Sequence, residues 1–173
     1  MTKTVLNFAI MFIVLVLVQV IVFNNLTLWG MALPLVFIYW IFSLPVGTGS
    51  VTAMSLAFIL GLTVDVFSDT PGQNARACTI LAAVRKPVLR LYFPREEDLT
   101  DPEPSMTSLG AAVYMKYAIT LTAIYCTTFF VVEAFTFFNL WRLLINIVCS
   151  TILTFILILA TASLTHITRE KRL

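Results

Sequence analysis

The most informative absence in this sequence is that of charge. Between Thr4 and Val64 the chain has no Asp, Glu, Lys, Arg or His, and most of the residues are Val, Leu, Ile, Phe, Met or Ala. A soluble domain needs charged groups on its surface, so this stretch excludes a water-soluble fold. One helical crossing of a bilayer takes about 20 apolar residues, so the stretch has room for about three crossings.

Residues that bind metals or carry redox chemistry are also scarce. The chain has one histidine, His166, and its three cysteines have no C-x-x-C spacing and lie in apolar stretches. We therefore expect buried, reduced thiols and no metal or other cofactor. The patterns of intramembrane proteases are missing, because Gly61–Asp65 does not match G-x-G-D and Gly47–Ser50 does not match G-x-S-G. We expect neither an enzyme nor a nucleic-acid-binding protein.

The apolar residues that are present divide into six segments of membrane-spanning length. Because backbone groups in lipid must be satisfied internally, each segment is expected to be a helix. The predicted spans are 5–23, 28–44, 51–67, 74–92, 112–135 and 143–166. We predict an all-α, polytopic bundle that forms one transmembrane domain over residues 1–173. The hydrophilic segment 94–107 is predicted to be a solvated cytoplasmic loop.

The positions of Lys and Arg predict the orientation of this bundle. With six spans and the N-terminus inside, all of the eleven basic residues except Arg76 and Arg142 lie on the inner side. Loops rich in Lys and Arg stay in the cytoplasm, so both termini are predicted to be cytoplasmic. If 74–92 did not cross, the two ends would lie on opposite sides.

Asp65 is an acidic residue in an otherwise apolar predicted helix. A carboxylate at membrane depth is costly and usually faces protein or water. Asp65 continues a row of small residues spaced by four, and small residues let another helix approach closely. We therefore hypothesise a helix-packing seam against a neighbouring helix or a partner protein, formed by Ala53, Ala57, Gly61 and Asp65. The alternative is a carboxylate that only ends the crossing at the lipid headgroups.

Other charged residues lie at the ends of the predicted spans. Two candidate ion pairs flank short turns: Asp65 with Arg76, and Glu133 with Arg142. Exposed pairs of this kind stabilise a fold little. A basic cluster follows in the fourth span and just after it, formed by Arg85, Lys86, Arg90 and Arg95. It has two interpretations, contact with anionic lipid or a cytoplasmic partner, or simple enforcement of topology.

The stretch Gly61–Ala75, which reads GLTVDVFSDTPGQNA, is similar to the G-L-x-x-D-x-F/L-S-x-x-P-x-G-x-x-A stretch of the rod shape-determining protein MreD family. Gly61, Asp65, Pro71 and Gly72 match its motif residues, although Pro71-Gly72 departs from the commoner spacing. The chain length, the basic end of the fourth span and the basic C-terminus also resemble this family.

The resemblance implies a non-enzymatic protein of the bacterial inner membrane that acts in the cell-elongation machinery. Its implied partners are MreC and, in a larger complex, RodA, a penicillin-binding transpeptidase and MreB. It also implies the six-helix fold of the substrate-binding subunits of energy-coupling-factor vitamin transporters.

Two functions follow as hypotheses. The first is a membrane scaffold that binds the transmembrane region of MreC. The alternative is a small-molecule-binding subunit of a transporter, which would need several polar groups that converge on a pocket. The polar residues available for such a pocket at the outer turns are Asn24, Asn25, Gln73, Asn74 and Asn139.

Overall fold

The computed structural model describes residues 2–23, 33–70, 72–93, 104–133 and 140–170, with the backbone alone at 2–5, 107–108, 133, 140 and 165–170. Every regular element within these residues is helical, as predicted. The elements are α1 (Thr2–Val18), a π-helical turn (Gln19–Phe23), a 3₁₀ turn (Val36–Ile38), α2 (Tyr39–Ser43), α3 (Ser50–Ser68), α4 (Gln73–Tyr92), α5 (Met106–Leu109), α6 (Ala111–Glu133) and α7 (Leu140–Glu170).

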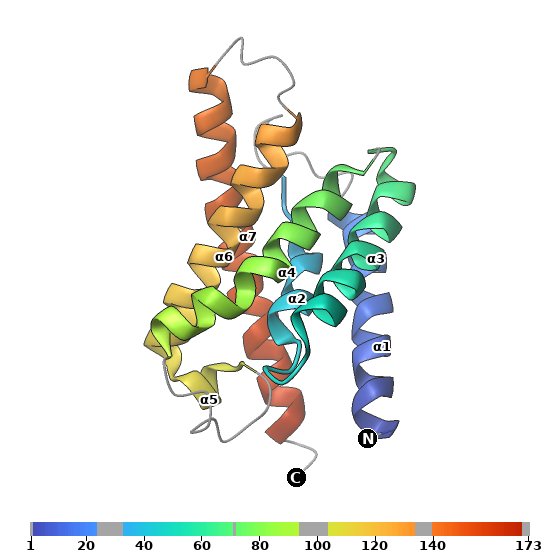
Figure 1. Ribbon diagram of the computed structural model, residues 1–173, viewed down its shortest axis with the longest axis vertical. Helices are drawn as coiled ribbons and strands as arrows, with labels where there is room; N and C mark the ends of the chain where they lie inside the picture. Colours follow the sequence, from blue (N-terminus) through green and yellow to red (C-terminus); the bar gives the residue numbers. More distant parts are fainter. Residues whose placement is uncertain (1, 24–32, 71, 94–103, 134–139, 171–173) are drawn as a thin grey trace.

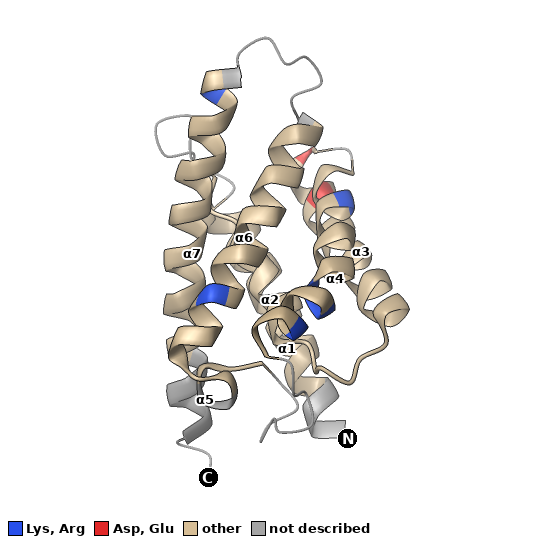
Figure 2. Cartoon of the chain, turned by 60° about the vertical axis from the view of Figure 1, so that its left-hand side comes forward, with Lys and Arg blue, Asp and Glu red and all other residues tan. Residues whose placement is uncertain are grey.

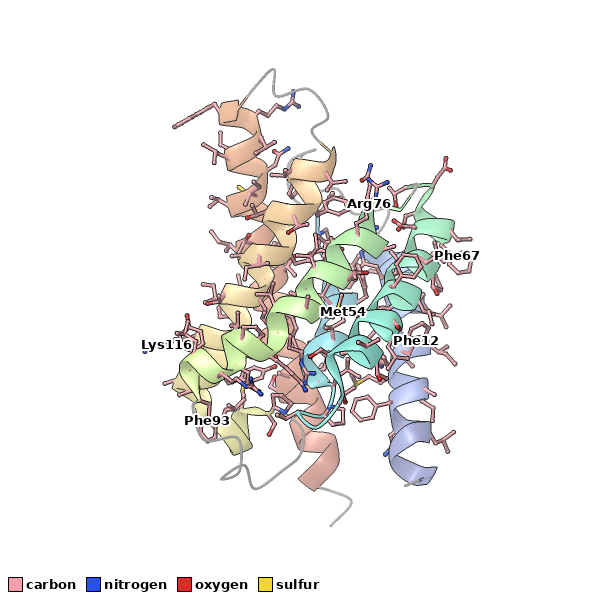
Figure 3. All side chains as sticks on the ribbon, viewed as in Figure 1. Phe12, Met54, Phe67, Arg76, Phe93 and Lys116 are labelled. Carbon is pink, nitrogen blue, oxygen red and sulfur yellow. The ribbon has the colours of Figure 1, made fainter. Side chains whose placement is uncertain are left out.

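Four of the helices are long and apolar enough to cross a membrane. They cover Leu6–Phe23, Ser50–Ser68, Ala111–Val132 and Trp141–Leu164. Their outward faces carry large apolar side chains that are more than half exposed, such as Ile13 on α1, Ile152 on α7 and Phe67 on α3, the last of which is labelled in Figure 3. A soluble monomer rarely exposes so much apolar surface. The prediction of an all-helical membrane protein is therefore confirmed, with four helices that are long and apolar enough to cross.

α4 forms where the fourth span is predicted, but its composition differs from that of the other long helices. It carries four basic residues, Arg76, Arg85, Lys86 and Arg90, and is not among the four apolar helices. Figure 1 shows α4 running obliquely between α3 and α6, and its most extensive contacts are with these two helices. Its buried face is mostly small and apolar, with Ala75, Ala77 and Ala82 among its residues, and it also buries Asn74 and Arg85.

The predicted continuous helix over 28–44 is wrong in its described part. Residues 28–32 lie outside the described residues, and from Leu33 to Leu44 only the 3₁₀ turn and the five-residue helix α2 form. Pro34 accounts for this, because proline lacks an N–H group and disfavours helical backbone in the residue before it. The segment still lies in the core, where Phe37 and Phe42 are fully buried.

The predicted loop 94–107 needs a smaller correction. Residues 94–103 lie outside the described residues, but Met106 begins the helical turn α5, and Leu109 at its end is buried. α5 packs on α6, so the end of the segment belongs to the fold. Figure 1 shows the start of α1 and the end of α7 at the same end of the molecule.

Candidate functional site at the junction of α3 and α4

Asp65, near the end of α3, binds the beginning of α4. Its Oδ1 atom accepts hydrogen bonds from the Thr70 hydroxyl (2.7 Å), the backbone N–H of Asn74 (3.0 Å) and the side-chain amide of Asn74 (2.9 Å), and its Oδ2 atom accepts one from the N–H of Ala75 (2.9 Å). The first N–H groups of a helix lack partners within it and carry partial positive charge. The N-cap residue of α4 is Gly72, which has no side chain to bind them. Asp65 therefore caps α4 from the neighbouring helix.

Asn74 extends this junction to α6. Its Oδ1 atom accepts a hydrogen bond of 2.6 Å from the Tyr125 hydroxyl, and both side chains are buried. Its Nδ2 atom also lies 3.3 Å from the Thr70 hydroxyl oxygen. The chain of hydrogen bonds from Asp65 through Asn74 to Tyr125 thus joins α3, α4 and α6.

Gly61, one turn before Asp65, lies directly against the backbone of α4. A Cβ atom at this position would fall 2.5 Å from the Cα atom of Ala75 and 2.6 Å from the carbonyl oxygen of Asn74. Ala53 and Ala57 are also buried on this face. The row of small residues predicted as a packing seam is therefore buried within the chain.

The turn between the helices depends on two residues with positive φ. Asp69 ends α3 at a φ of 55° and Gly72 precedes α4 at a φ of 75°. Asp tolerates this left-handed conformation better than most residues, and glycine adopts it without steric cost. Gly72 therefore occupies a backbone conformation that favours glycine, whereas Pro71 lies outside the described residues.

The candidate ion pairs are not part of this junction. Arg76 is exposed and points away from the bundle (Figure 3), and the donors bound to Asp65 are Thr70, Asn74 and Ala75. The predicted pair of Asp65 with Arg76 is thus replaced by helix capping, because the backbone N–H groups of α4 lie closer. Arg142 is exposed, and the side chain of Glu133 lies outside the described residues.

A second polar cluster, not predicted from the sequence, surrounds Pro34. Gln19 accepts a hydrogen bond from the N–H of Val36 (3.0 Å) and donates one to the carbonyl of Pro34 (2.9 Å). From α7, Ser150 accepts from the N–H of Leu33 (3.0 Å) and Thr154 accepts from that of Leu35 (3.2 Å). Irregular backbone at membrane depth is tolerated only where protein or a cavity satisfies it. The side chains of Gln19, Ser150 and Thr154 supply hydrogen-bond partners to the backbone of the segment before α2.

The chemistry available at the α3–α4 junction is structural. Asp65 is buried and already accepts four hydrogen bonds. Among the described residues, no three His, Cys, Asp or Glu side chains gather in a way that would hold a metal ion. The junction therefore fixes how α3, α4 and α6 pack.

Comparison of the chain with protein-family models, curated proteins and solved structures gives no match. The resemblance of Gly61–Ala75 to the MreD family stays a prediction.

Proposed function

We propose that this chain is a non-enzymatic scaffold of the bacterial plasma membrane, of the MreD kind, that binds the transmembrane region of MreC. One observation carries the proposal: the residues of the MreD-like motif serve helix packing. Gly61 brings α3 and α4 together, and Asp65 caps α4. A carboxylate that already accepts four hydrogen bonds is poorly suited to proton transfer or substrate binding.

The proposal includes six membrane crossings with both termini in the cytoplasm. Five of the crossings are the helices α1, α3, α4, α6 and α7. The sixth is the segment that contains α2. An even number of crossings agrees with the start of α1 and the end of α7 lying at one end of the molecule. Three of the four basic residues of α4, Arg85, Lys86 and Arg90, lie in its second half, and Figure 2 shows this half nearer that end, while other basic residues lie at the start of α4 and of α7. This excess of Lys and Arg agrees with an inner side at that end under the positive-inside rule.

The MreC helix would bind the outer apolar face of α1 or α7. In each of these helices 17% of the spanning residues are buried within the chain, compared with 44% in α6. Their outward side chains include Ile10 and Ile13 on α1 and Val148 and Ile152 on α7. Helices in lipid associate by side-chain packing, so an exposed apolar face suits a transmembrane partner. RodA, the transpeptidase and MreB would assemble around this pair.

Site-specific photo-crosslinking in native membranes tests the proposal. A photoreactive amino acid is placed at Ile13 or Ile152, with Ile80 on α4 as the exposed control. We expect a crosslink to MreC from α1 or α7 and none from Ile80. The absence of MreC both from these crosslinks and from a pull-down of the wild-type chain would contradict the scaffold role.

The transporter alternative has less support. Of the outer polar residues that would line its pocket, Asn74 is bonded to Asp65 and Tyr125 and is buried. Asn24, Asn25 and Asn139 lie outside the described residues. A thermal-shift screen with vitamins separates the two functions, because a clear stabilising ligand would favour transport.

A further inference from the structure

The outward face of α4 is bounded by two exposed arginines, Arg76 near its start and Arg90 near its end. Arg76 points away from the bundle, at the end where α3 and α4 join (Figure 3). Between the two arginines the exposed residues of α4 are Ile80, Ala83 and Pro87. An α-helix rises 1.5 Å per residue, so the Cα atoms of the two arginines lie about 21 Å apart along the axis. The apolar part of this face is therefore short.

The orientation of α4 reduces the depth that it spans still further. Its 20 residues extend for about 30 Å, which equals the thickness of the hydrocarbon core of a bilayer only when a helix stands upright. Figure 1 shows α4 crossing the bundle obliquely, whereas α1 and α7 run along its long axis. Between its two arginines α4 therefore spans less than the full hydrocarbon core.

The middle of the same face has a second polar feature. Proline has no N–H group, so Pro87 leaves the carbonyl of Ala83 without the donor that an α-helix normally supplies. The side chains of Ala83 and Pro87 are exposed, and Lys86 next to them is half-buried. A carbonyl without a donor is costly in hydrocarbon, which water does not reach. This part of α4 is thus suited to a thin layer, in which headgroups and water lie close.

α7 presents a much longer apolar face to the same bilayer. Its spanning part, Trp141–Leu164, has 24 residues and extends for about 36 Å. Exposed large apolar side chains occur along it from Leu144 through Ile152 to Leu164. Figure 2 shows α6 lying between α7 and α4, so the two faces meet different lipids. A bilayer of uniform thickness cannot match both.

We propose that α4 is a surface that thins the bilayer. Phospholipids against its outward face form a hydrocarbon layer of about 20 Å, set by Arg76 and Arg90, while those against α7 keep the full thickness. A span that is too short is accommodated by local thinning or by side chains that extend to the headgroups. The oblique course of α4 and the carbonyl of Ala83 favour thinning. The proposal rests on the six crossings of the proposed function, of which α4 is one.

Fluorescence quenching in bilayers of different thickness tests the proposal. The purified full chain carries a fluorescent amino acid, excited above the absorption of tryptophan, at Ala83 or at Ile152, near the middle of each face. It is reconstituted in dimyristoleoyl, dioleoyl or dierucoyl phosphatidylcholine, with a nitroxide on a fraction of the headgroups. We expect a progressive loss of quenching at Ile152 as the acyl chains lengthen, because the headgroups move away.

Quenching at Ala83 should change little with acyl chain length, because the headgroups beside α4 stay about 10 Å from it. A loss at Ala83 parallel to that at Ile152 would overturn the proposal. It would show that Arg76 and Arg90 extend their side chains through a layer of full thickness.

The double variant Arg76→Leu/Arg90→Leu assigns the thinning to the two arginines. It extends the apolar face along α4, so quenching at Ala83 should now fall as the acyl chains lengthen. Arg142→Leu is the matched control, because it removes an exposed arginine from the start of α7, and it should behave as the wild type. If the double variant does not fold, Arg76→Leu alone should give a smaller fall. Quenching at Ala83 that responds equally in the arginine variants of α4 and in Arg142→Leu would overturn the role of Arg76 and Arg90.

Labelling from the two sides of the membrane separates this proposal from the proposed function. Gln73→Cys and Leu91→Cys, at the two ends of α4, should react with a membrane-impermeant maleimide from opposite sides. Reaction from one side only would overturn both the six crossings and the thinning. Labelling from opposite sides together with parallel quenching at Ala83 and Ile152 would overturn the thinning alone. The absence of MreC from the crosslinks and the pull-down would overturn the scaffold role alone.

Discussion

Gly61 on α3 lies directly against Ala75 on α4: a Cβ atom added to Gly61 would fall 2.5 Å from the Cα atom of Ala75. The N–H group of the same alanine donates a hydrogen bond to Asp65, one turn further along α3. Close approach and capping therefore act on the same turn of α4. The first brings the N–H groups of α4 within reach of the carboxylate, and the second holds them there.

Replacing Gly61 by alanine should destabilise the protein even though only one methyl group is added. The atoms it would meet are backbone atoms of Asn74 and Ala75, which cannot rotate away as a side chain can. Overpacking of this kind costs about 1–3 kcal/mol. We expect the midpoint of thermal unfolding in detergent to fall by about 2–10 °C.

Gly47→Ala is the matched control for this substitution. A Cβ atom at Gly47 would have nothing within 4 Å, and Gly47 does not have a positive φ. Its midpoint should stay at the wild-type value or rise slightly, because alanine restricts the unfolded chain. Equal losses in Gly61→Ala and Gly47→Ala would show that α3 and α4 are not in close contact.

Asp65→Asn should weaken the cap of α4 without changing the size of the side chain. The substitution replaces a charged acceptor by an amide, one end of which must face N–H donors from Asn74 or Ala75. Hydrogen bonds to charged groups contribute about 1.5–3 kcal/mol each, so we expect the free energy of unfolding to fall by about 2–3 kcal/mol. Denaturant or thermal unfolding in detergent measures the change.

Asp69→Asn separates capping from a general effect of lost charge. Asp69 is exposed and lies in the left-handed region, which asparagine also tolerates. Its free energy of unfolding should change by less than about 0.5 kcal/mol. If Asp65→Asn were equally mild, the carboxylate would not hold α4.

The helices could be predicted because each long apolar run has few ways to satisfy its backbone in lipid. The span predicted over 51–67 is observed as α3, Ser50–Ser68. The irregular segment around Pro34 could not be predicted in this way. Hydropathy is the same whether its N–H groups bond within a helix or to Ser150 and Thr154, which are more than a hundred residues away.

The candidate site could be predicted in part. The spacing of Ala53, Ala57, Gly61 and Asp65 identifies the face of α3 that is buried, because residues four apart share a side of a helix. The same spacing cannot show what covers that face. The turn with two positive φ angles folds α4 back on α3, and only then do N–H groups of α4 meet Asp65.

Tyr125→Phe tests whether α6 is tied to the same junction. The substitution removes the hydroxyl that donates a hydrogen bond of 2.6 Å to Asn74, and it leaves the buried Oδ1 atom of Asn74 without that donor. An unsatisfied buried acceptor costs about 1–3 kcal/mol. We expect a loss of that size in the free energy of unfolding.

A double-mutant cycle makes the test specific. In an Asp65→Asn background the network through Asn74 is already weakened, so Tyr125→Phe should cost less than it does alone. Coupled residues in one hydrogen-bond network show interaction energies of about 0.5–3 kcal/mol. Strictly additive losses would mean that Tyr125 and Asp65 act independently.

Gln19→Leu should be the most damaging change outside the α3–α4 junction. Leucine is apolar and somewhat shorter than glutamine, and it leaves the N–H of Val36 and the carbonyl of Pro34 without their partner. Each unsatisfied buried group costs about 1–3 kcal/mol, so the expected loss is about 2–5 kcal/mol. Ser55→Ala is the control, because the exposed Ser55 hydroxyl bonds only to the carbonyl of Val51 in its own helix. If the unfolding midpoint in detergent fell equally in both variants, Gln19 would not hold the irregular segment in the core.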